Sequence, residues 1–325
     1  MPERAPELSD ILRAEALLRP HIWNTGARRS AALSDRFGAE IVLKPENLQR
    51  LGSFKIRGAL NRMNELARSS AKAVITASAG NHGQGVAYAA MVAGMAATIV
   101  VPQTASPAKI DALQRMGADL RLIGKTFDEA EDAAYAIAED ERMPMVSPYD
   151  GQVIAGQGTV GYEFVREVPD LDLLLVPVSA GGLLAGCLIA AKAMNPRVTV
   201  VGVQSEAAPA MVAARAAGRI VEVDCAESLA DGLSGNIARG HLPFSIIQRL
   251  VDDLVLVDEA AIAAAMRLFV ADERLIVEGA GAVGLAALLS GKINVAGRRV
   301  GLVISGGNVA YETLRSVLAG AGEAG

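Results

Sequence analysis

The sequence predicts an α/β protein with two doubly wound, open parallel-sheet domains. Short runs rich in valine, isoleucine and leucine alternate with helical patterns of about 10 to 15 residues, which is typical of parallel sheets covered by helices on both faces. Several of these runs end in loops of glycine, serine and asparagine, where open parallel sheets bind ligands. The chain of 325 residues is long enough for two hydrophobic cores of ordinary size.

The predicted elements follow one another with recognisable boundaries. A leading helical segment is expected over residues 6–40. Strands are expected at residues 41–43, 73–76, 98–101, 120–123, 173–178, 198–203, 254–257 and 300–304. Helices are expected at residues 86–95, 107–117, 127–139, 183–194, 209–217, 259–272, 281–289 and from about 309. Ser106 before Pro107 is a typical helix start, and Gly94, Gly117 and Gly218 are typical helix ends.

The composition argues against several classes of protein. Apolar residues make up 51% of the chain, and the net charge of −5 without a long basic run argues against nucleic acid as a partner. Cys187 and Cys225 show no metal-binding spacing and no secretory signal is visible, so a cytoplasmic setting is expected. The apolar stretches at 73–108 and 173–191 contain glycine and proline turn signals, so no membrane span is expected.

One lysine stands at the expected start of a helix, in the motif that runs from Gly52 to Ala59. Ser53 is a favourable N-cap, which would put Lys55 in the first turn. The positive end of the helix disfavours a second positive charge there and lowers the pKa of the amine. A lysine that loses its proton easily can form a Schiff base with an aldehyde. The alternative for this segment alone is an exposed lysine on a surface helix.

Four glycine-containing loops carry polar residues at the expected strand ends. The loop from Ser78 to Gly83 and the loop from Ser179 to Leu183 would suit a carboxylate or a phosphate, because backbone N–H groups and a helix N-terminus converge there. The loop from Ser305 to Asn308 presents a hydroxyl at the edge of the sheet, and Gly156 to Thr159 forms the fourth loop. Any tight strand-to-helix connection favours glycine, so a single loop of this type is weak support.

Two stretches match the dinucleotide pattern G-x-G-x-x-G, namely Gly156 to Gly161 and Gly279 to Gly284. The second follows the apolar residues 275–277 and precedes an expected helix. The fingerprint also requires an acidic residue about 20 positions later, at the end of the next strand. That strand ends in Ser305, so an NAD-dependent oxidoreductase is kept as an alternative only.

The order of these motifs resembles that of the fold-type II pyridoxal-phosphate enzymes, whose fold is like that of the tryptophan synthase beta chain. Within that group the chain is most similar to the serine/threonine dehydratases of the catabolic type, from about residue 20 to the end. The resemblance implies a large cofactor-binding domain formed by residues 1–70 and 149–325, and a small substrate-binding domain formed by residues 71–148. No C-terminal regulatory domain is expected after the Ser305 motif, and a homodimer is typical of the family.

The resemblance implies a role for each polar position. Lys55 would hold pyridoxal 5'-phosphate as a Schiff base, Phe54 would pack near its ring, and Ser305 would meet the pyridine nitrogen. Asn81 would hydrogen-bond the phenolic oxygen, and Glu278 would lie near the ring, with a helix-capping glutamate as the alternative. The phosphate would be cradled by Ser179, Ala180, Gly181, Gly182 and Leu183. The substrate carboxylate would be held by Ser78, Ala79, Gly80, Asn81 and His82.

The implied activity is that of an ammonia-lyase that dehydrates a β-hydroxy amino acid, L-threonine or L-serine, to a 2-oxo acid and ammonia. A neutral serine beside the pyridine nitrogen favours β-elimination over transamination. The alternatives are a dehydratase specialised for 3-hydroxyaspartate, phenylserine or a hydroxyectoine-derived amino acid, a serine racemase-like enzyme, and a non-catalytic ligand-binding protein.

The sequence departs from the family at informative positions. Ser179 and Ala180 stand where similar dehydratases carry glycine, and Leu51 stands where they carry threonine. Related serine racemases have a second catalytic serine where this chain has Ala79, so racemisation is expected to be weak. They also bind a divalent cation with acidic residues at positions where this chain has Gln204 and Ala210, so no metal site is expected.

Overall fold

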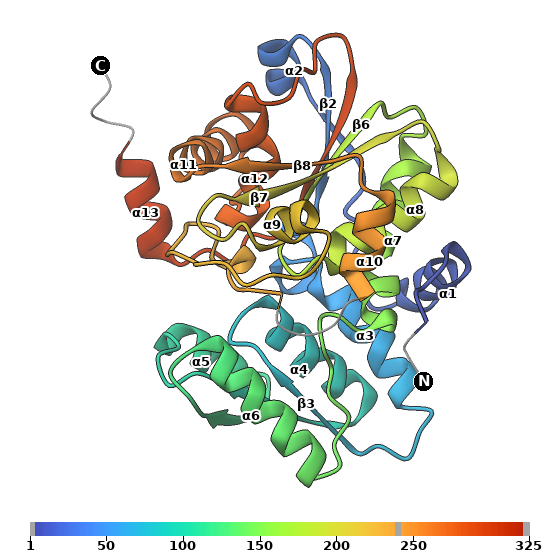
Figure 1. Cartoon of the computed structure of the whole chain (residues 1–325), viewed down its shortest axis with the longest axis vertical. Coiled ribbons are helices and arrows are strands. Elements are labelled where there is room, and N and C mark those ends of the chain that lie inside the picture. The colour runs from blue at the N-terminus through green and yellow to red at the C-terminus, as the bar shows by residue number, and fades with distance from the viewer. Residues whose placement is uncertain (1–3, 238–241, 321–325) are drawn as a thin grey trace.

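The computed structural model describes residues 4–237 and 242–320, and it contains two separate sheets with helices packed around each (Figure 1). The larger sheet has the strand order β1-β2-β9-β6-β7-β8. Its strands are β1 (Arg28–Ser30), β2 (Glu40–Pro45), β6 (Leu173–Pro177), β7 (Thr199–Ser205), β8 (Asp253–Val257) and β9 (Arg299–Ile304). The smaller sheet has the order β3-β4-β5, from β3 (Ala73–Ala77), β4 (Ala96–Val101) and β5 (Asp119–Leu122).

The helices alternate with the strands along the chain. Those that precede or surround the smaller sheet are α1 (Leu8–Leu18), α2 (Ala31–Phe37), α3 (Lys55–Leu66), α4 (Asn81–Ala93), α5 (Pro107–Arg115) and α6 (Phe127–Asp140). Those that follow are α7 (Gly151–Glu167), α8 (Gly182–Met194), α9 (Ala210–Ala217), α10 (Leu242–Leu250), α11 (Glu259–Leu268), α12 (Gly279–Leu289) and α13 (Tyr311–Ala319).

Both sheets are parallel apart from β1, which pairs antiparallel with β2 at the edge of the larger sheet. All five residues of the central strand β6 are buried, as expected for a parallel strand covered on both faces. Every residue of α12 from Gly279 to Leu288 is buried too, since this helix packs between the sheet and α11. The predicted α/β fold class is therefore confirmed, and each predicted strand overlaps an observed one.

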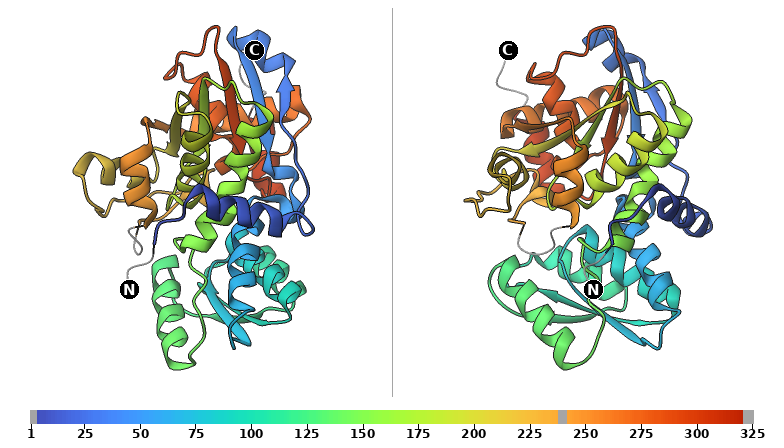
Figure 2. Two further views of the ribbon diagram at one scale, coloured as in Figure 1. Left: turned by 90° about the vertical axis from the view of Figure 1, so that its right-hand side faces the viewer. Right: turned by 45° about the vertical axis from the view of Figure 1, so that its right-hand side comes forward.

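The chain crosses between the two sheets at α3 and returns through residues 144–150, where the N–H of Val146 donates to the carbonyl of Ile75 in β3 and the N–H of Ile75 donates to the carbonyl of Pro144. In Figures 1 and 2 the smaller sheet and its helices form a lower lobe, and α3, α4 and α7 lie where the two lobes meet. The carboxyl ends of β3, β6 and β9 lead into the loops that the sequence singled out.

Two predictions about elements were wrong. The expected helical segment over residues 6–40 consists of α1 and α2 with β1 between them. The expected loop Gly156 to Thr159 lies inside α7, where its glycines permit close helix packing. A Cβ on Gly158 would lie 3.0 Å from the carbonyl oxygen of Gly186 in α8, and one on Gly156 would overlap the carbonyl of Arg57 in α3. The glycines therefore reflect interhelical distance and not a turn.

The two dinucleotide patterns also lie within helices. Gly156 to Gly161 falls in the middle of α7, and Gly279 to Gly284 opens α12 without a preceding strand, since residues 275–278 form none. A dinucleotide fingerprint requires a strand, a tight turn and a helix in that order. The structure therefore removes the basis for the NAD-dependent alternative.

None of the helices in the described residues has the length and apolar character needed to cross a bilayer. In the same part of the chain Cys187 is a buried free thiol and Cys225 an exposed one.

Candidate active site

Lys55 is the first residue of α3, at the level where the two lobes meet. Burial lowers the pKa of its amine to about 8, and the nearby carboxylate of Glu278 opposes part of that shift. The sequence-based prediction attributed a lowered pKa to the helix terminus, whereas desolvation is the larger cause in the structure. The Nζ of Lys55 lies 5.2 Å from the centre of the Phe54 ring. The expected helix start was wrong by one residue, because Phe54 and not Ser53 occupies the N-cap.

The segment before Lys55 is held against the end of β9 by an antiparallel backbone ladder. Ser53 bridges to Gly306, the N–H of Phe54 donates to the carbonyl of Ser305 over 3.1 Å, and the N–H of Gly307 donates to that of Gly52 over 2.9 Å. Ser305 is therefore fixed beside Lys55 as part of an extended segment, and it is not the helix N-cap that its residue type alone suggested. This ladder brings the first and last predicted motifs together.

Arg57 anchors the start of α3. Its guanidinium is fully buried and makes two hydrogen bonds each to Glu46 and Glu163, of 2.7 to 2.9 Å, and one to Thr159. Lys44 adds an ion pair to Glu163 at 2.7 Å. A buried charge needs such complete pairing, and the fork of an arginine fits two carboxylates bidentately. The sequence reasoning missed this network, because its members are far apart in the chain.

The loop after β3 places Asn81 and His82 in the first turn of α4. The ring Nε2 of His82 donates to the carbonyl of Val146 over 2.9 Å, which fixes the neutral tautomer because a carbonyl can only accept. Burial and, to a smaller extent, the charge of Lys55 lower the pKa of His82 to about 4. The Oγ of Ser78 accepts from the N–H of Gly80 over 3.2 Å, so these residues form a compact turn.

Glu278 links the two lobes at the site. The amide Nδ2 of Asn81 donates to its Oε1 over 2.9 Å and to its Oε2 over 3.2 Å, and the N–H of Asn308 donates to Oε2 over 3.1 Å. Burial raises the pKa of this carboxyl to about 7, an effect that the Asn81 hydrogen bond partly offsets. Glu278 precedes α12 but makes no side-chain cap hydrogen bond, so its side chain serves the site and not the helix.

The loop from Ser179 to Leu183 connects β6 to α8. Gly181 has φ +95°, a backbone conformation that favours glycine, and a Cβ there would lie 2.6 Å from Ile247. A Cβ on Gly182 would lie 2.6 Å from Oε1 of Gln157 and 2.9 Å from the carbonyl of Pro148. The two positions that keep the family's glycine are thus the ones without room for a side chain. Ser179 and Ala180 are half-buried and carry side chains.

These residues fit the predicted cofactor, an aldehyde that carries a phosphate. A buried amine with a pKa near 8 suits an aldehyde, and the N-terminus of α8 with its side-chain-free approach suits a phosphate. The loop from Ser179 to Leu183 and helix α3 both lie against the side chain of Gln157. A Cβ built on Gly58 of α3 would lie 3.1 Å from that side chain. The structure thus brings all four groups of predicted residues to the region between the lobes.

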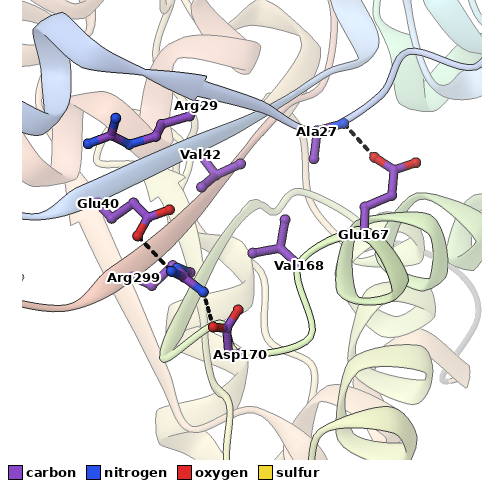
Figure 3. A pocket seen from close by; sticks show the side chains of 8 residues that line it. All are labelled: Ala27, Arg29, Glu40, Val42, Glu167, Val168, Asp170 and Arg299. Carbon is purple, nitrogen blue, oxygen red and sulfur yellow. Dashed lines mark hydrogen bonds and ion pairs between the residues drawn. The ribbon is translucent and has the colours of Figure 1, made fainter.

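A separate pocket of about 310 Å³ lies at the other edge of the larger sheet (Figure 3). Arg299, the first residue of β9, pairs there with Glu40 and Asp170, while Glu167 accepts from the N–H of Ala27. Open parallel sheets bind ligands at the carboxyl ends of their strands, and this pocket lies at the amino end of β9. Its charges are also largely paired with one another, so it is not the candidate active site.

The positions of the cation site found in related racemases have other uses here. Oε1 of Gln204 accepts from the N–H groups of Met211 and Val212 at the start of α9. Glu206 pairs with Lys292 at 2.9 Å. No group of three His, Cys, Asp or Glu side chains suited to a metal ion occurs within residues 4–237 and 242–320.

Comparison with known proteins identifies the family. The profile of the pyridoxal-phosphate dependent enzymes matches residues 18–306. The chain is 45% identical to an L-threonine ammonia-lyase of Thermotoga maritima over 304 residues, covering 93% of this chain and 75% of that protein. It is 40% identical to the catabolic L-threonine dehydratase of Escherichia coli strain K12 over 307 residues, covering 93% of each chain.

Two solved structures of similar enzymes superpose on this chain over nearly its whole length. Maize serine racemase superposes with a TM-score of 0.91 at 32% identity, covering 98% of both chains. The processed form of threonine deaminase isoform 2 from Solanum lycopersicum superposes with a TM-score of 0.88 at 34% identity, covering 98% of this chain and 91% of the other. The predicted fold-type II architecture and the predicted class, a pyridoxal-phosphate-dependent lyase, are confirmed. The chain belongs to the family of pyridoxal-phosphate-dependent enzymes, and pyridoxal 5'-phosphate is its cofactor.

Proposed function

We propose that this protein dehydrates a β-hydroxy amino acid, with L-threonine and L-serine as substrates, to a 2-oxo acid and ammonia. The observation that carries this proposal is the buried amine of Lys55, with a pKa near 8, beside a neutral Ser305 and opposite the turn that begins α4. Relatives named as threonine ammonia-lyase or threonine dehydratase, at 40% to 45% identity, support the same substrate class.

Each cofactor contact is assigned to a residue of the site. Lys55 would bind the aldehyde carbon, Phe54 would pack against the ring, and Ser305 would meet the pyridine nitrogen. Asn81 would donate to the phenolic oxygen, and Glu278 would lie near the ring. The phosphate is bound at the α8 N-terminus by Ser179, Ala180, Gly181, Gly182 and Leu183, where the free N–H groups and the helix dipole favour an anion.

The substrate carboxylate is bound by the turn of Ser78, Ala79, Gly80, Asn81 and His82. The first N–H groups of α4 lack intrahelical partners and suit a carboxylate, as the first intrahelical bond is that of Gln84 to Gly80. His82 contributes its backbone N–H and not its ring, because the ring Nε2–H is committed to Val146. This refines the sequence-based assignment, which did not distinguish ring from backbone.

The proton transfers follow from the same geometry. The bound cofactor supplies an electron sink for the pair left at the substrate Cα. The Lys55 amine would be the base that removes the Cα proton, and a pKa near 8 keeps an appreciable fraction of it unprotonated near neutral pH. A serine at the pyridine nitrogen cannot carry the charge of a carboxylate, and this favours loss of the β-hydroxyl over transamination.

The direct test is release of 2-oxo acid by the cofactor-loaded protein. The panel contains L-threonine, L-serine, threo-3-hydroxyaspartate, 3-phenylserine and a hydroxyectoine-derived amino acid, with Lys55→Ala as the matched control. We expect rapid release from threonine and serine and none from the variant. Release from one of the other three alone would identify a specialised dehydratase instead, and undiminished activity of Lys55→Ala would reject the assigned role of the lysine.

We also propose that residues 1–70 and 149–325 form the cofactor-binding domain and residues 71–148 the substrate-binding domain of a cytoplasmic homodimer. The two sheets divide along these ranges, and the free thiols suit a reducing compartment. Trp23 and Leu48 are 54% and 48% exposed, and the backbone N–H of Trp23 donates to Oε1 of Gln49. Large exposed apolar side chains suit a subunit interface. A monomeric mass in analytical ultracentrifugation would reject the dimer.

A further inference from the structure

We propose that Asn308 is a positioning residue that fixes the orientation of the Asn81 carboxamide, and this rests on the cofactor role proposed for Asn81. Asn308 lies at the end of the Ser305 motif, and the sequence-based assignment included no role for its side chain. That side chain is exposed at the meeting of the two lobes and contacts both the segment before Lys55 and the first residue of α4.

The orientation of the Asn308 amide is determined by a backbone carbonyl. Its Nδ2 donates to the carbonyl oxygen of Leu51 over 2.7 Å. A peptide carbonyl can only accept, so the NH₂ end of Asn308 must face Leu51. Its Oδ1 then lies over Gly52, where any Cβ would overlap it. The turn thus has room for the asparagine only because residue 52 is glycine.

The same NH₂ group sets the orientation of Asn81. Nδ2 of Asn308 also donates to Oδ1 of Asn81 over 2.7 Å. The NH₂ end of Asn81 must therefore point the other way, and it donates to Glu278 over 2.9 and 3.2 Å. The carbonyl of Leu51 therefore fixes the orientation of the Asn308 carboxamide, and Asn308 in turn fixes that of the Asn81 carboxamide, which donates to the Glu278 carboxylate. Every donor in this series faces an acceptor.

Asn308 is itself held in place by its backbone. Its N–H donates to Glu278 over 3.1 Å, and its neighbour Gly307 is part of the ladder with Gly52. Leu51 and Gly52 both have left-handed backbone conformations, with φ of 64° and 71°, and Leu51 is not a glycine. Such a conformation persists where the surroundings hold it, and the Asn308 hydrogen bond to Leu51 is one such restraint.

Asn81 depends on this partner because it belongs to the other lobe. Asn81 begins α4, beside the smaller sheet. Asn308 follows β9 of the larger sheet, and Glu278 precedes α12, which packs on that sheet. Without the Asn308 amide the Oδ1 of Asn81 would lose its donor, and its carboxamide could turn its oxygen toward the cofactor. A donor to the phenolic oxygen would then be replaced by an acceptor.

The test uses Asn308→Asp, which keeps the shape and removes both donors, together with Asn308→Ala. Asn294→Asp is the matched control, because Asn294 is exposed and lies in a turn where its Oδ1 accepts from the N–H of Ala296. The readouts are the dissociation constant of pyridoxal 5'-phosphate from the apoenzyme and the pH dependence of its absorbance when bound at Lys55. We expect about tenfold weaker binding for Asn308→Asp, as for the loss of the single hydrogen bond proposed from Asn81 to the phenolic oxygen, together with a displaced absorbance titration. Neither change is expected for Asn294→Asp.

A double-mutant cycle separates positioning from simple structural support. If Asn308 acts through Asn81, Asn308→Ala weakens cofactor binding in the wild-type background and changes it less than about twofold in an Asn81→Ala background. Equal losses in the two backgrounds, or wild-type affinity and titration for Asn308→Asp, would overturn the proposal. Thermal unfolding of each apo variant verifies the fold. Both readouts work without substrate, so they are independent of which hydroxy amino acid, if any, is dehydrated.

Discussion

Glu278 illustrates how the surroundings of one residue alter its chemistry. Burial raises the pKa of its carboxyl to about 7, so near neutral pH the group exchanges its proton readily. Its hydrogen bonds from Asn81 and Asn308 favour the charged form and keep the rise in pKa from being larger. A carboxyl beside Lys55 with a pKa near 7 can accept or release a proton near neutral pH. Shifted pKa values of this kind are common at functional sites.

This raised pKa makes a prediction about stability. The folded protein retains the Glu278 proton up to about pH 7, while the unfolded chain releases it near its ordinary value of 4.5. Stability is therefore lost as pH rises through that window, by about 3 kcal/mol for a fully buried group. Glu278→Gln removes this dependence. The stability of the apo variant relative to wild type, measured as the difference in unfolding free energy in denaturant, should be greater at about pH 8 than at about pH 4.

A pH-independent difference between these two proteins would contradict the raised pKa. A pH-independent contribution to the difference in unfolding free energy is expected in addition, because the glutamine carboxamide has one acceptor oxygen where the carboxylate has two. The informative quantity is the change of the difference with pH.

Ala79 carries the prediction that separates dehydration from racemisation. It is half-buried in the turn before α4, the turn proposed to bind the substrate carboxylate. Racemisation needs an acid or base on each side of the Cα, and a methyl group supplies neither. Ala79→Ser should introduce measurable conversion of L-serine to D-serine, detected by chiral chromatography. If no D-serine accumulates while dehydration persists, position 79 does not face the Cα.

At the scale of elements, α7 shows what sequence patterns could not distinguish. Its glycines at positions 156 and 158 suggested a loop, yet together with Gly161 they form the face that packs on α3 and α8. A glycine needed for a turn and a glycine needed for a close helix contact look alike in one sequence. The second depends on partners in other helices, α3 and α8 here, and local sequence patterns do not report them.

The same contact predicts a large effect from one methyl group. A Cβ on Gly186 would lie within 2.6 to 2.7 Å of the Gly158 backbone and the Ile154 carbonyl, all backbone atoms that cannot turn aside. Gly186→Ala should therefore destabilise the protein by about 1 to 3 kcal/mol through overpacking of α7 against α8, measured by urea unfolding. Gly320→Ala is the matched control, since its nearest neighbour is 3.6 Å away. Equal stability of both variants would refute the close contact.

At the scale of the whole molecule, the site is assembled from both lobes. Glu278 and Ser305 border elements of the larger sheet, Lys55 opens α3 where the chain crosses between the sheets, and Asn81 and His82 open a helix beside the smaller sheet. Direct links between the lobes there include the Asn81 hydrogen bonds to Glu278 and Asn308, and an exposed ion pair of Lys109 with Asp231 at 3.0 Å. A cofactor that contacts both lobes adds to these links.

Cofactor binding should accordingly stabilise the whole fold. At a concentration 100 times its dissociation constant, pyridoxal 5'-phosphate should add about 2.7 kcal/mol to the unfolding free energy, because it binds the folded state only. Thermal unfolding across a series of cofactor concentrations measures this gain. Lys55→Ala should gain much less, and inorganic phosphate serves as the control for the phosphate site alone. The same gain with phosphate would show that the ring and the aldehyde contribute nothing.

The sequence by itself determined the alternation of strands and helices, the strand-end position of the polar loops and the family, because these depend on local periodicity and on motifs of a few contiguous residues. The tertiary structure decided which of them meet. Gly156 to Thr159 proved to be helical, Ser53 became part of a ladder, and Asn308 was placed between Leu51 and Asn81. The lowered pKa of Lys55 likewise comes mainly from burial, which only the packing of both lobes produces. Contacts between residues more than 200 positions apart leave no periodic trace in a single chain, so the folded molecule alone reveals them.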